Sequence, residues 1–229
     1  MKDPYVHKNG TLKNKLGITS YEELKAAETD IGYVKLLNAE SVMKSRCDIT
    51  LIKDIHRHLF EDIFEWAGEF RTVPVYKEEL VIPGISLEYA DTKDIDSRLT
   101  KCLEKMNADN WENMNLEELS SQFVSYLAKI WRIHPFRDGN TRTTLTFANI
   151  FAREHGFEMD MSTLIDNLGR KVNPETGKVV RWSIRDKFVL AALDEQHCPE
   201  PQALEQIIKR AINNGIKKKI EFLNEMLER

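Results

Sequence analysis

Apolar residues recur every three or four positions along most of this 229-residue chain, and this spacing limits its possible folds more than any other feature. Side chains at such a spacing line one face of an α-helix. The clearest series lies near the C-terminus and comprises Leu204, Ile208, Ile212, Ile216, Ile220, Leu223 and Leu227. The sequence therefore predicts an all-α protein in which each helix buries one apolar face.

The same spacing predicts a succession of amphipathic helices before the last one. Glu23 follows Ser20 by three residues, which is the spacing of a capping box at a helix N-terminus. Glu118 follows Asn115 in the same way. Gly215 lies within the C-terminal series and predicts that the helix is broken or bent there. The expected helices cover residues 20–44, 49–65, 88–107, 115–133, 140 to about 151, 182–193 and 204–227.

Two stretches depart from the helical period. Residues 71–76 and 80–82 are short β-prone runs joined by three charged residues, and Pro83 and Gly84 follow them. They predict a β-hairpin, and because two strands have no larger sheet to join, we expect a small flap on a helical body. Residues 165–181 are rich in turn formers and predict a surface loop or a small hairpin.

Composition and charge exclude several classes of protein. Hydrophobic residues make up 41% and charged residues 31% of the chain, which suffices for a sizeable core and excludes a disordered protein. The formal net charge of −4 gives no general attraction for nucleic acid or acidic membranes. The N-terminus shows no signal peptide, and three widely spaced cysteines argue against a disulfide framework. We therefore expect a cytoplasmic protein whose partners include neither a membrane nor a nucleic acid.

The chain divides into three expected regions. Residues 1–18 are polar and irregular and predict an N-terminal arm. Residues 19–195 hold most of the expected helices and form the main domain. Pro199 and Pro201 punctuate the link to a C-terminal amphipathic helical extension over 196–229.

Residues 133–143 carry the strongest chemical signal. The proline at position 135 disfavours helical geometry at His134, so we expect its imidazole where one helix ends. Asp138, Gly139 and Asn140 then open the next helix, and the glycine lets the backbone approach a ligand closely. The N-terminus of a helix offers unpaired backbone N–H groups and a partial positive charge to a phosphate.

The side chains of this stretch suit phosphate chemistry. Asp138 is a hard oxygen ligand for Mg²⁺ bound with a polyphosphate. Asn140 and Arg142 can donate hydrogen bonds to phosphate oxygens, and His134 can take a proton from an attacking hydroxyl. Taken one by one, these residues have a purely structural explanation, because residues 134–136 could simply end a helix and residues 138–140 could form a common turn. Their gathering within nine positions favours phosphoryl or nucleotidyl transfer.

Residues 134–142 read HPFRDGNTR, and this run resembles the signature of the Fic (filamentation induced by cAMP) family, HPFx(D/E)GN(G/K)R, at eight of its nine positions. Residues 13–18 and 59–71 are also similar to N-terminal parts of small bacterial Fic proteins. The resemblance covers about residues 13–195.

The resemblance implies a Fic fold, which is a helical bundle with a β-hairpin flap over the active site. The usual activity of that family is transfer of AMP from ATP to a protein hydroxyl with release of pyrophosphate. By this likeness His134 is the general base on a Ser, Thr or Tyr hydroxyl, Asp138 binds Mg²⁺, and Phe136 anchors the loop. The positions that would surround the nucleotide phosphates are Gly139, Asn140, Thr141 and Arg142.

The hairpin expected at residues 71–82 falls where the family has its flap. In the family the flap binds the target protein by strand pairing. By the same likeness Lys77, at the turn of the hairpin, contacts the target or the nucleotide. A solvent-exposed turn lysine is the plain alternative.

Two positions depart from the pattern of the family. At the position of Thr141, family members that transfer AMP carry Gly, and relatives that act as protein kinases carry Lys. Because Thr is uncharged, we favour AMP transfer. Leu145 stands where many members carry a second arginine that holds the outer phosphate. Many Fic proteins are also restrained by a helix with the motif (S/T)xxxE(G/N), which this sequence lacks. We therefore expect restraint by a separate antitoxin or none at all.

Several alternatives stay open. Thr141 and Leu145 are compatible with a related transferase that uses another nucleotide or phosphate donor, or with a catalytically silent nucleotide-binding module. The hypothesis of a helical DNA-binding protein is supported only by the basic run 217–219, and it conflicts with the negative net charge of the chain. His56 and His58 lie two positions apart on an expected helix and point to different sides, so they predict no metal site.

Overall fold

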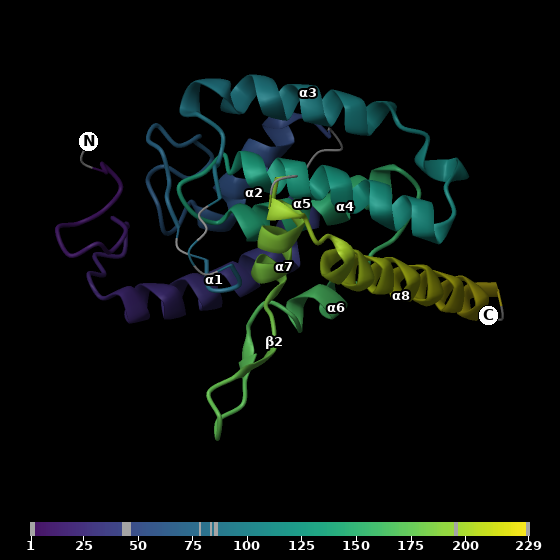
Figure 1. The fold of residues 1–229 in the computed structure, drawn as a ribbon. Helices are drawn as coiled ribbons and strands as arrows, with labels where there is room; N and C mark the ends of the chain where they lie inside the picture. Colours follow the sequence, from purple (N-terminus) through teal and green to yellow (C-terminus); the bar gives the residue numbers. More distant parts are fainter. Residues whose placement is uncertain are drawn as a thin grey trace. The chain divides into compact units, whose positions relative to one another are not determined.

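The computed structural model describes residues 3–42, 47–77, 79–82, 84, 87–194 and 197–227, and most of these lie in helices (Figure 1). The helices are α1 (Tyr21–Val42), α2 (Ile49–Phe60), α3 (Ile95–Ala108), α4 (Leu116–Ile133), α5 (Asn140–Glu154), α6 (Met161–Ile165), α7 (Ile184–Ala191) and α8 (Gln202–Leu227). Short 3-10 turns, η1 (Thr92–Asp94) and η2 (Trp111–Asn113), precede α3 and α4. One antiparallel pair joins β1 (Lys171–Val172) to β2 (Val179–Arg181). The prediction of a mainly helical fold with one small hairpin is confirmed.

The chain packs into two compact units, each assembled from separate stretches of sequence. The first unit contains Met1–Val75, Tyr89–Glu104 and Ile133–Ile150, and it holds α1, α2 and most of α3 and α5. The second contains Tyr76–Glu88, Lys105–Arg132 and Phe151–Arg229, and it holds most of α4 with the hairpin, α6, α7 and α8. The three regions expected from the sequence stay predictions.

Helix α2 shows how the sequence shapes the first unit. The Asp48 carboxylate accepts the N–H groups of Thr50 and Leu51 at 2.9 and 3.2 Å and so caps the helix. The predicted apolar stripe of α2 is buried, and the helix packs against α1. It ends at Phe60 rather than at residue 65, because tight turns follow in which the N–H groups of Ile63 and Phe64 both bond to the Phe60 carbonyl.

The second unit is built around aromatic rings and the long helix α8. Four rings pack at centroid distances of 5.3 to 6.1 Å, and they belong to Trp111, Phe123, Phe151 and Phe157. The capping box predicted at Asn115 is confirmed, because its side chain accepts the Glu118 N–H while the Glu118 carboxylate accepts the Asn115 N–H, both at 3.1 Å.

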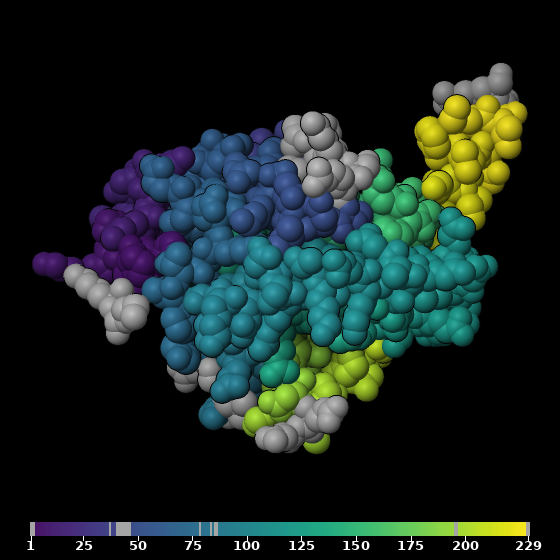
Figure 2. Space-filling view, turned by 90° about the horizontal axis from the view of Figure 1, so that it is seen from above, coloured from purple at the N-terminus to yellow at the C-terminus, as the bar shows by residue number. Residues whose placement is uncertain are grey.

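Helix α8 runs without a break from Gln202 to Leu227, so a break at Gly215 is excluded, and a bend there stays a prediction. A Cβ at this glycine would lie 2.6 Å from the Glu158 carbonyl oxygen, so the missing side chain allows a close approach of two backbones. Beyond Gly215 the apolar side chains of α8 are exposed, and Figure 2 shows this end of the helix in yellow.

The strands predicted within residues 71–82 are wrong, because none of the described residues of this segment is in a strand. The described hairpin lies at 171–181 instead, in the loop that offered a hairpin as its alternative. Tertiary contacts explain the difference. The Arg71 guanidinium binds the Val73 carbonyl, and the buried Glu79 carboxylate binds Arg185 of α7 through two hydrogen bonds of 2.6 Å. These side-chain contacts hold the segment in an irregular conformation.

No helix among the described residues is long and apolar enough to span a lipid bilayer.

Candidate active site

His134 is the first residue after α4 and has a left-handed backbone, with φ at +52°. Such a conformation is strained for a non-glycine residue and persists only when its surroundings hold it. Pro135 explains why the helix stops here, as the sequence predicted. The imidazole is buried and stacks on the ring of Tyr89, with centroids 4.0 Å apart and planes at 20°. The ring is therefore fixed in orientation.

Arg71 holds the backbone around His134. Its Nε donates to the His134 carbonyl at 2.8 Å, its own N–H donates to the Pro135 carbonyl at 2.8 Å, and its Nη2 donates to the Ala90 carbonyl. The guanidinium is buried, and burial lowers its pKa from the ordinary range, with the charge of Asp91 opposing this shift. This role was not visible in the sequence, because an arginine in a β-prone run resembles a surface residue.

Asn140 closes the loop between His134 and α5. Its Oδ1 accepts the Phe136 N–H at 3.0 Å, and its Nδ2 donates to the Phe136 carbonyl at 2.9 Å. Both ends of the amide therefore order the loop in this structure. A contact of Asn140 with phosphate stays a prediction.

Gly139 is required by the packing beneath the loop. Its φ is +77°, and a Cβ at this position would lie 2.4 Å from the Phe60 ring. Only glycine fits both the backbone and the space. The Gly139 N–H donates to Oδ1 of Asp138 at 2.7 Å, and its carbonyl accepts the Thr143 N–H at 3.0 Å in the first turn of α5.

His56 of α2 supports the loop from below. The Gly68 N–H donates to Nδ1 at 2.8 Å, so the proton of the neutral ring lies on Nε2, which contacts the Asp138 carbonyl at 3.2 Å. Burial lowers the pKa of His56 to about 3. His58 contacts the Lys35 carbonyl instead, which confirms that the two histidines point to different partners.

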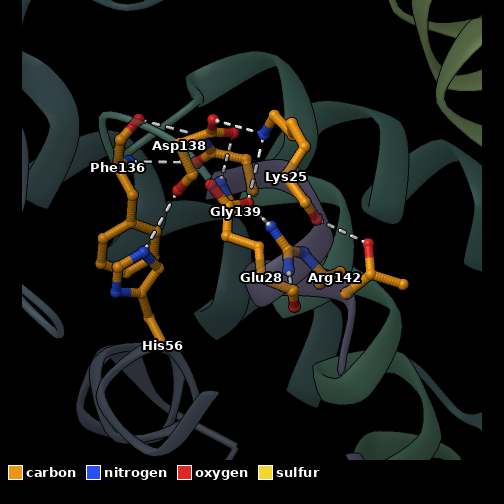
Figure 3. Close-up of polar contacts among 9 residues, drawn as sticks. Lys25, Glu28, His56, Phe136, Asp138, Gly139 and Arg142 are labelled. Carbon is orange, nitrogen blue, oxygen red and sulfur yellow. Dashed lines mark hydrogen bonds and ion pairs between the residues drawn. The ribbon is translucent and has the colours of Figure 1, made fainter. Parts of the chain in front are cut away.

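A chain of charges links the motif to α1 (Figure 3). The Lys25 ammonium lies 3.4 Å from Oδ2 of Asp138 and 3.1 Å from Oε2 of Glu28. The same Glu28 oxygen accepts Nη2 of Arg142 at 2.6 Å, and the Glu28 carbonyl accepts Nη1 at 3.2 Å. Burial lowers the pKa of Lys25, but Asp138 and Glu28 outweigh it and raise the pKa overall. The sequence missed Lys25 and Glu28, because a lysine and a glutamate three apart on a helix usually face solvent.

The other predicted site residues are placed as follows. Thr141 is half-buried at the second position of α5. Leu145 lies on the same helix and is buried in the core, so it brings no charge to the site. Lys77 belongs to the second unit, and its contact with the target or nucleotide stays a prediction.

Asp138 suits a magnesium ion that arrives with a nucleotide. The described residues contain no group of three or more potential metal-ligating side chains, so they form no metal cage made by the protein alone. Magnesium instead commonly takes one or two carboxylates, phosphate oxygens and water. A single carboxylate of which 25% is exposed, at the start of a helix, fits that arrangement.

Comparison with known proteins identifies the domain. Residues 46–152 match the model of the Fic/DOC family. The chain is 28% identical over 161 residues to "Protein adenylyltransferase VbhT" of Bartonella schoenbuchensis. The aligned region covers 69% of this chain and 32% of that protein. It is 33% identical over 129 residues to "Probable protein adenylyltransferase y4lH" of Sinorhizobium fredii, covering 55% of this chain and 62% of that protein.

The fold also matches solved structures of this family. BepC of Bartonella tribocorum, solved with bound AMPPNP, superposes with a TM-score of 0.68 at 19% identity, covering 90% of this chain and 95% of that one. Residues 46–152 therefore match the Fic/DOC family, as the resemblance in the sequence predicted, and the solved structures show the same fold. The chain spans about a third of the length of VbhT.

Proposed function

We propose that this protein is an adenylyltransferase that moves AMP from Mg-ATP to a Ser, Thr or Tyr hydroxyl of a target protein and releases pyrophosphate. One observation carries the proposal. A rigidly held histidine, His134, directly precedes a loop that brings Asp138 and Arg142 together at the N-terminus of α5. The names of the relatives VbhT and y4lH support the same reaction.

In this mechanism His134 acts as the general base. Its imidazole takes the proton of the target hydroxyl while the hydroxyl oxygen attacks the α-phosphorus. A new oxygen–phosphorus bond forms, the bond to the bridging oxygen between the α- and β-phosphates breaks, and pyrophosphate leaves with the electron pair. Stacking on Tyr89 and the Arg71 contacts to the backbone fix the imidazole before the substrate arrives.

The phosphate end of the nucleotide meets the start of α5. Gly139, Asn140 and Thr141 line the anion-binding site, where the helix N-terminus favours negative charge. Arg142 adds a guanidinium, and Asp138 holds the Mg²⁺, which would neutralise phosphate charge when bound. Thr141 brings no charge of its own, which agrees with AMP transfer.

The target protein binds along the segment 71–82 by main-chain pairing, with Lys77 near its turn. The enzyme acts in the cytoplasm, where a separate small antitoxin restrains it or restraint is absent. Purification of the chain from its source cells with a bound small protein would support this part.

Mass spectrometry after incubation with Mg-ATP and a bacterial lysate tests the proposed reaction. We expect the mass of AMP on this chain or on a lysate protein with the wild type, and none with His134→Ala. A second candidate is a transferase with another donor, with which Thr141 and Leu145 are compatible because both depart from the pattern of the family. Replacing ATP by GTP, CTP or UTP separates the two, because only the correct donor yields a modified protein.

A further inference from the structure

We propose that Lys25 of α1 is a phosphate-binding residue of this site, and that the buried Glu28 is the positioning residue that presents Lys25 and Arg142 together. The inference rests on the proposed function, since it names the groups that receive the nucleotide phosphates. It adds a residue of α1 to the phosphate site, although α1 lies about a hundred residues before the motif.

The geometry of Glu28 comes first. Its Oε2 contacts both the Lys25 ammonium at 3.1 Å and Nη2 of Arg142 at 2.6 Å. The two nitrogens therefore lie no further apart than the sum of these distances. The Glu28 side chain is only 2% exposed, so it fixes the two cations without itself being open to a ligand. One buried carboxylate thus holds two cations close enough to bind a single polyphosphate.

The cations, unlike Glu28, are accessible. The side chains of Lys25 and Arg142 are 39% and 22% exposed. Arg142 has five N–H groups, and the bonds described for it, both to Glu28, use two of them. Its guanidinium also lies over the Phe60 ring, 4.5 Å from the centroid, which fixes its plane. The remaining donors are preorganised for an anion.

Space for this arrangement is built into α1. Gly32 lies one turn beyond Glu28, and a Cβ there would approach Nη1 of Arg142 to 3.2 Å. Glycine in a helix interior makes the helix less stable than alanine does. The glycine at position 32 is explained because a side chain there would crowd the Arg142 guanidinium.

The net charge of the cluster would change if a metal ion bound to Asp138. Lys25 and Arg142 balance Glu28 and Asp138, so the ligand-free cluster is neutral. A divalent cation at Asp138 would repel the Lys25 ammonium from that carboxylate, and the cluster would become positive. Lys25 is then left facing the phosphates that accompany the metal. The carboxylate of Asp138 is its partner without nucleotide, and phosphate oxygen is its partner with nucleotide.

Isothermal titration of the full chain with Mg-AMPPNP and with adenosine tests this assignment. We expect Lys25→Gln to weaken binding of Mg-AMPPNP by roughly ten- to a hundredfold, the usual effect of losing a charged hydrogen bond, and to leave adenosine binding unchanged. Lys25→Arg should retain most of the affinity. Lys15→Gln is the matched control, because Lys15 is 38% exposed and pairs with Glu65, and it should bind as the wild type does.

Labelling of lysines with an amine-reactive reagent gives a second measurement that needs no variant. Mg-AMPPNP should protect Lys25 in the wild type and leave Lys15 reactive. Unchanged Mg-AMPPNP affinity in Lys25→Gln, or no protection of Lys25, would overturn the inference alone. Tighter binding in Glu28→Gln would overturn the positioning role of Glu28. A wild type that binds none of these nucleotides would overturn the proposed function together with the inference.

Discussion

The imidazole of His56 stacks on the ring of Phe136, with centroids 3.8 Å apart and planes 13° apart. The imidazole of His56 also contacts the Asp138 carbonyl through its Nε2 at 3.2 Å. A buried, neutral histidine on α2 thus holds the motif loop at two points. The loop carries the site, so the protonation state of His56 is coupled to the stability of the site.

This coupling predicts how stability depends on pH. Burial lowers the pKa of His56 to about 3 in the folded protein, whereas the unfolded chain takes up this proton near pH 6.5. Between these values the unfolded state binds more protons, so the contribution of His56 to stability is complete above pH 6.5 and is lost as the pH falls toward 3. We expect His56 to add a slope of up to about 1.4 kcal/mol per pH unit to the free energy of unfolding.

Urea unfolding of the wild type and His56→Gln at several pH values between 4 and 7 measures this slope. Glutamine keeps a donor and an acceptor but does not titrate, so the variant should show a shallower dependence. Equal slopes in the two proteins would contradict a neutral, buried His56.

The packing of Gly139 on Phe60 predicts a large effect of one methyl group. In Gly139→Ala the new Cβ would lie 2.4 Å from the Phe60 ring, in addition to the backbone strain at positive φ. We expect a loss of about 2–4 kcal/mol in the free energy of unfolding, and weaker nucleotide binding because the loop shifts.

Gly10→Ala is the matched control for this substitution. Gly10 also has a positive φ, +87°, but a Cβ added there would meet nothing within 4 Å. The Gly10→Ala variant should lose only about 1–2 kcal/mol in the free energy of unfolding, because of backbone strain, and its nucleotide affinity should stay unchanged. Similar losses in both variants would show that the contact with Phe60 does not matter.

The ion pair between the buried Glu79 and the half-buried Arg185 predicts that the segment 76–88 is anchored to α7. Glu79→Gln leaves the guanidinium without its two charged bonds, and we expect a loss of about 3 kcal/mol in the free energy of unfolding. Denaturant titration measures the loss. Limited proteolysis should show earlier cleavage within 76–88.

Lys219→Gln provides the comparison, because Lys219 pairs with Glu158 at 3.0 Å on the exposed part of α8. An exposed pair contributes about 0–1 kcal/mol, so this variant should unfold almost as the wild type does. A loss in Glu79→Gln no larger than in Lys219→Gln would mean that the buried pair does not anchor the segment.

The sequence predicted the helices well, since the burial of α2 and the capping box at Asn115 follow from local patterns. It also located the motif, because His134 and Asp138 lie in one short run. The strands at 71–82 were predicted wrongly because β-propensity describes local preference, whereas Arg71 and Glu79 take part in contacts with distant residues.

The supports of the site were not predictable for a similar reason. Lys25 and Glu28 are separated from Asp138 and Arg142 by more than a hundred residues, and only the fold brings them together. The sequence predicted only that His56 and His58 point to different sides, and the partners at the two nitrogens of His56, Gly68 and Asp138, lie far from it along the chain. Periodicity shows which face of a helix is buried, but it does not show which polar groups that face will meet.

The most direct test of the central claim compares ATP labelled at the α-phosphate with ATP labelled at the γ-phosphate. Wild-type protein and His134→Ala are incubated with each nucleotide, Mg²⁺ and a bacterial lysate, and label on protein is measured. AMP transfer predicts that protein retains label from the α-phosphate alone, and that His134→Ala lowers it by roughly a hundredfold or more. Label retained from the γ-phosphate alone, or equal labelling by the wild type and the variant, would contradict the proposed function.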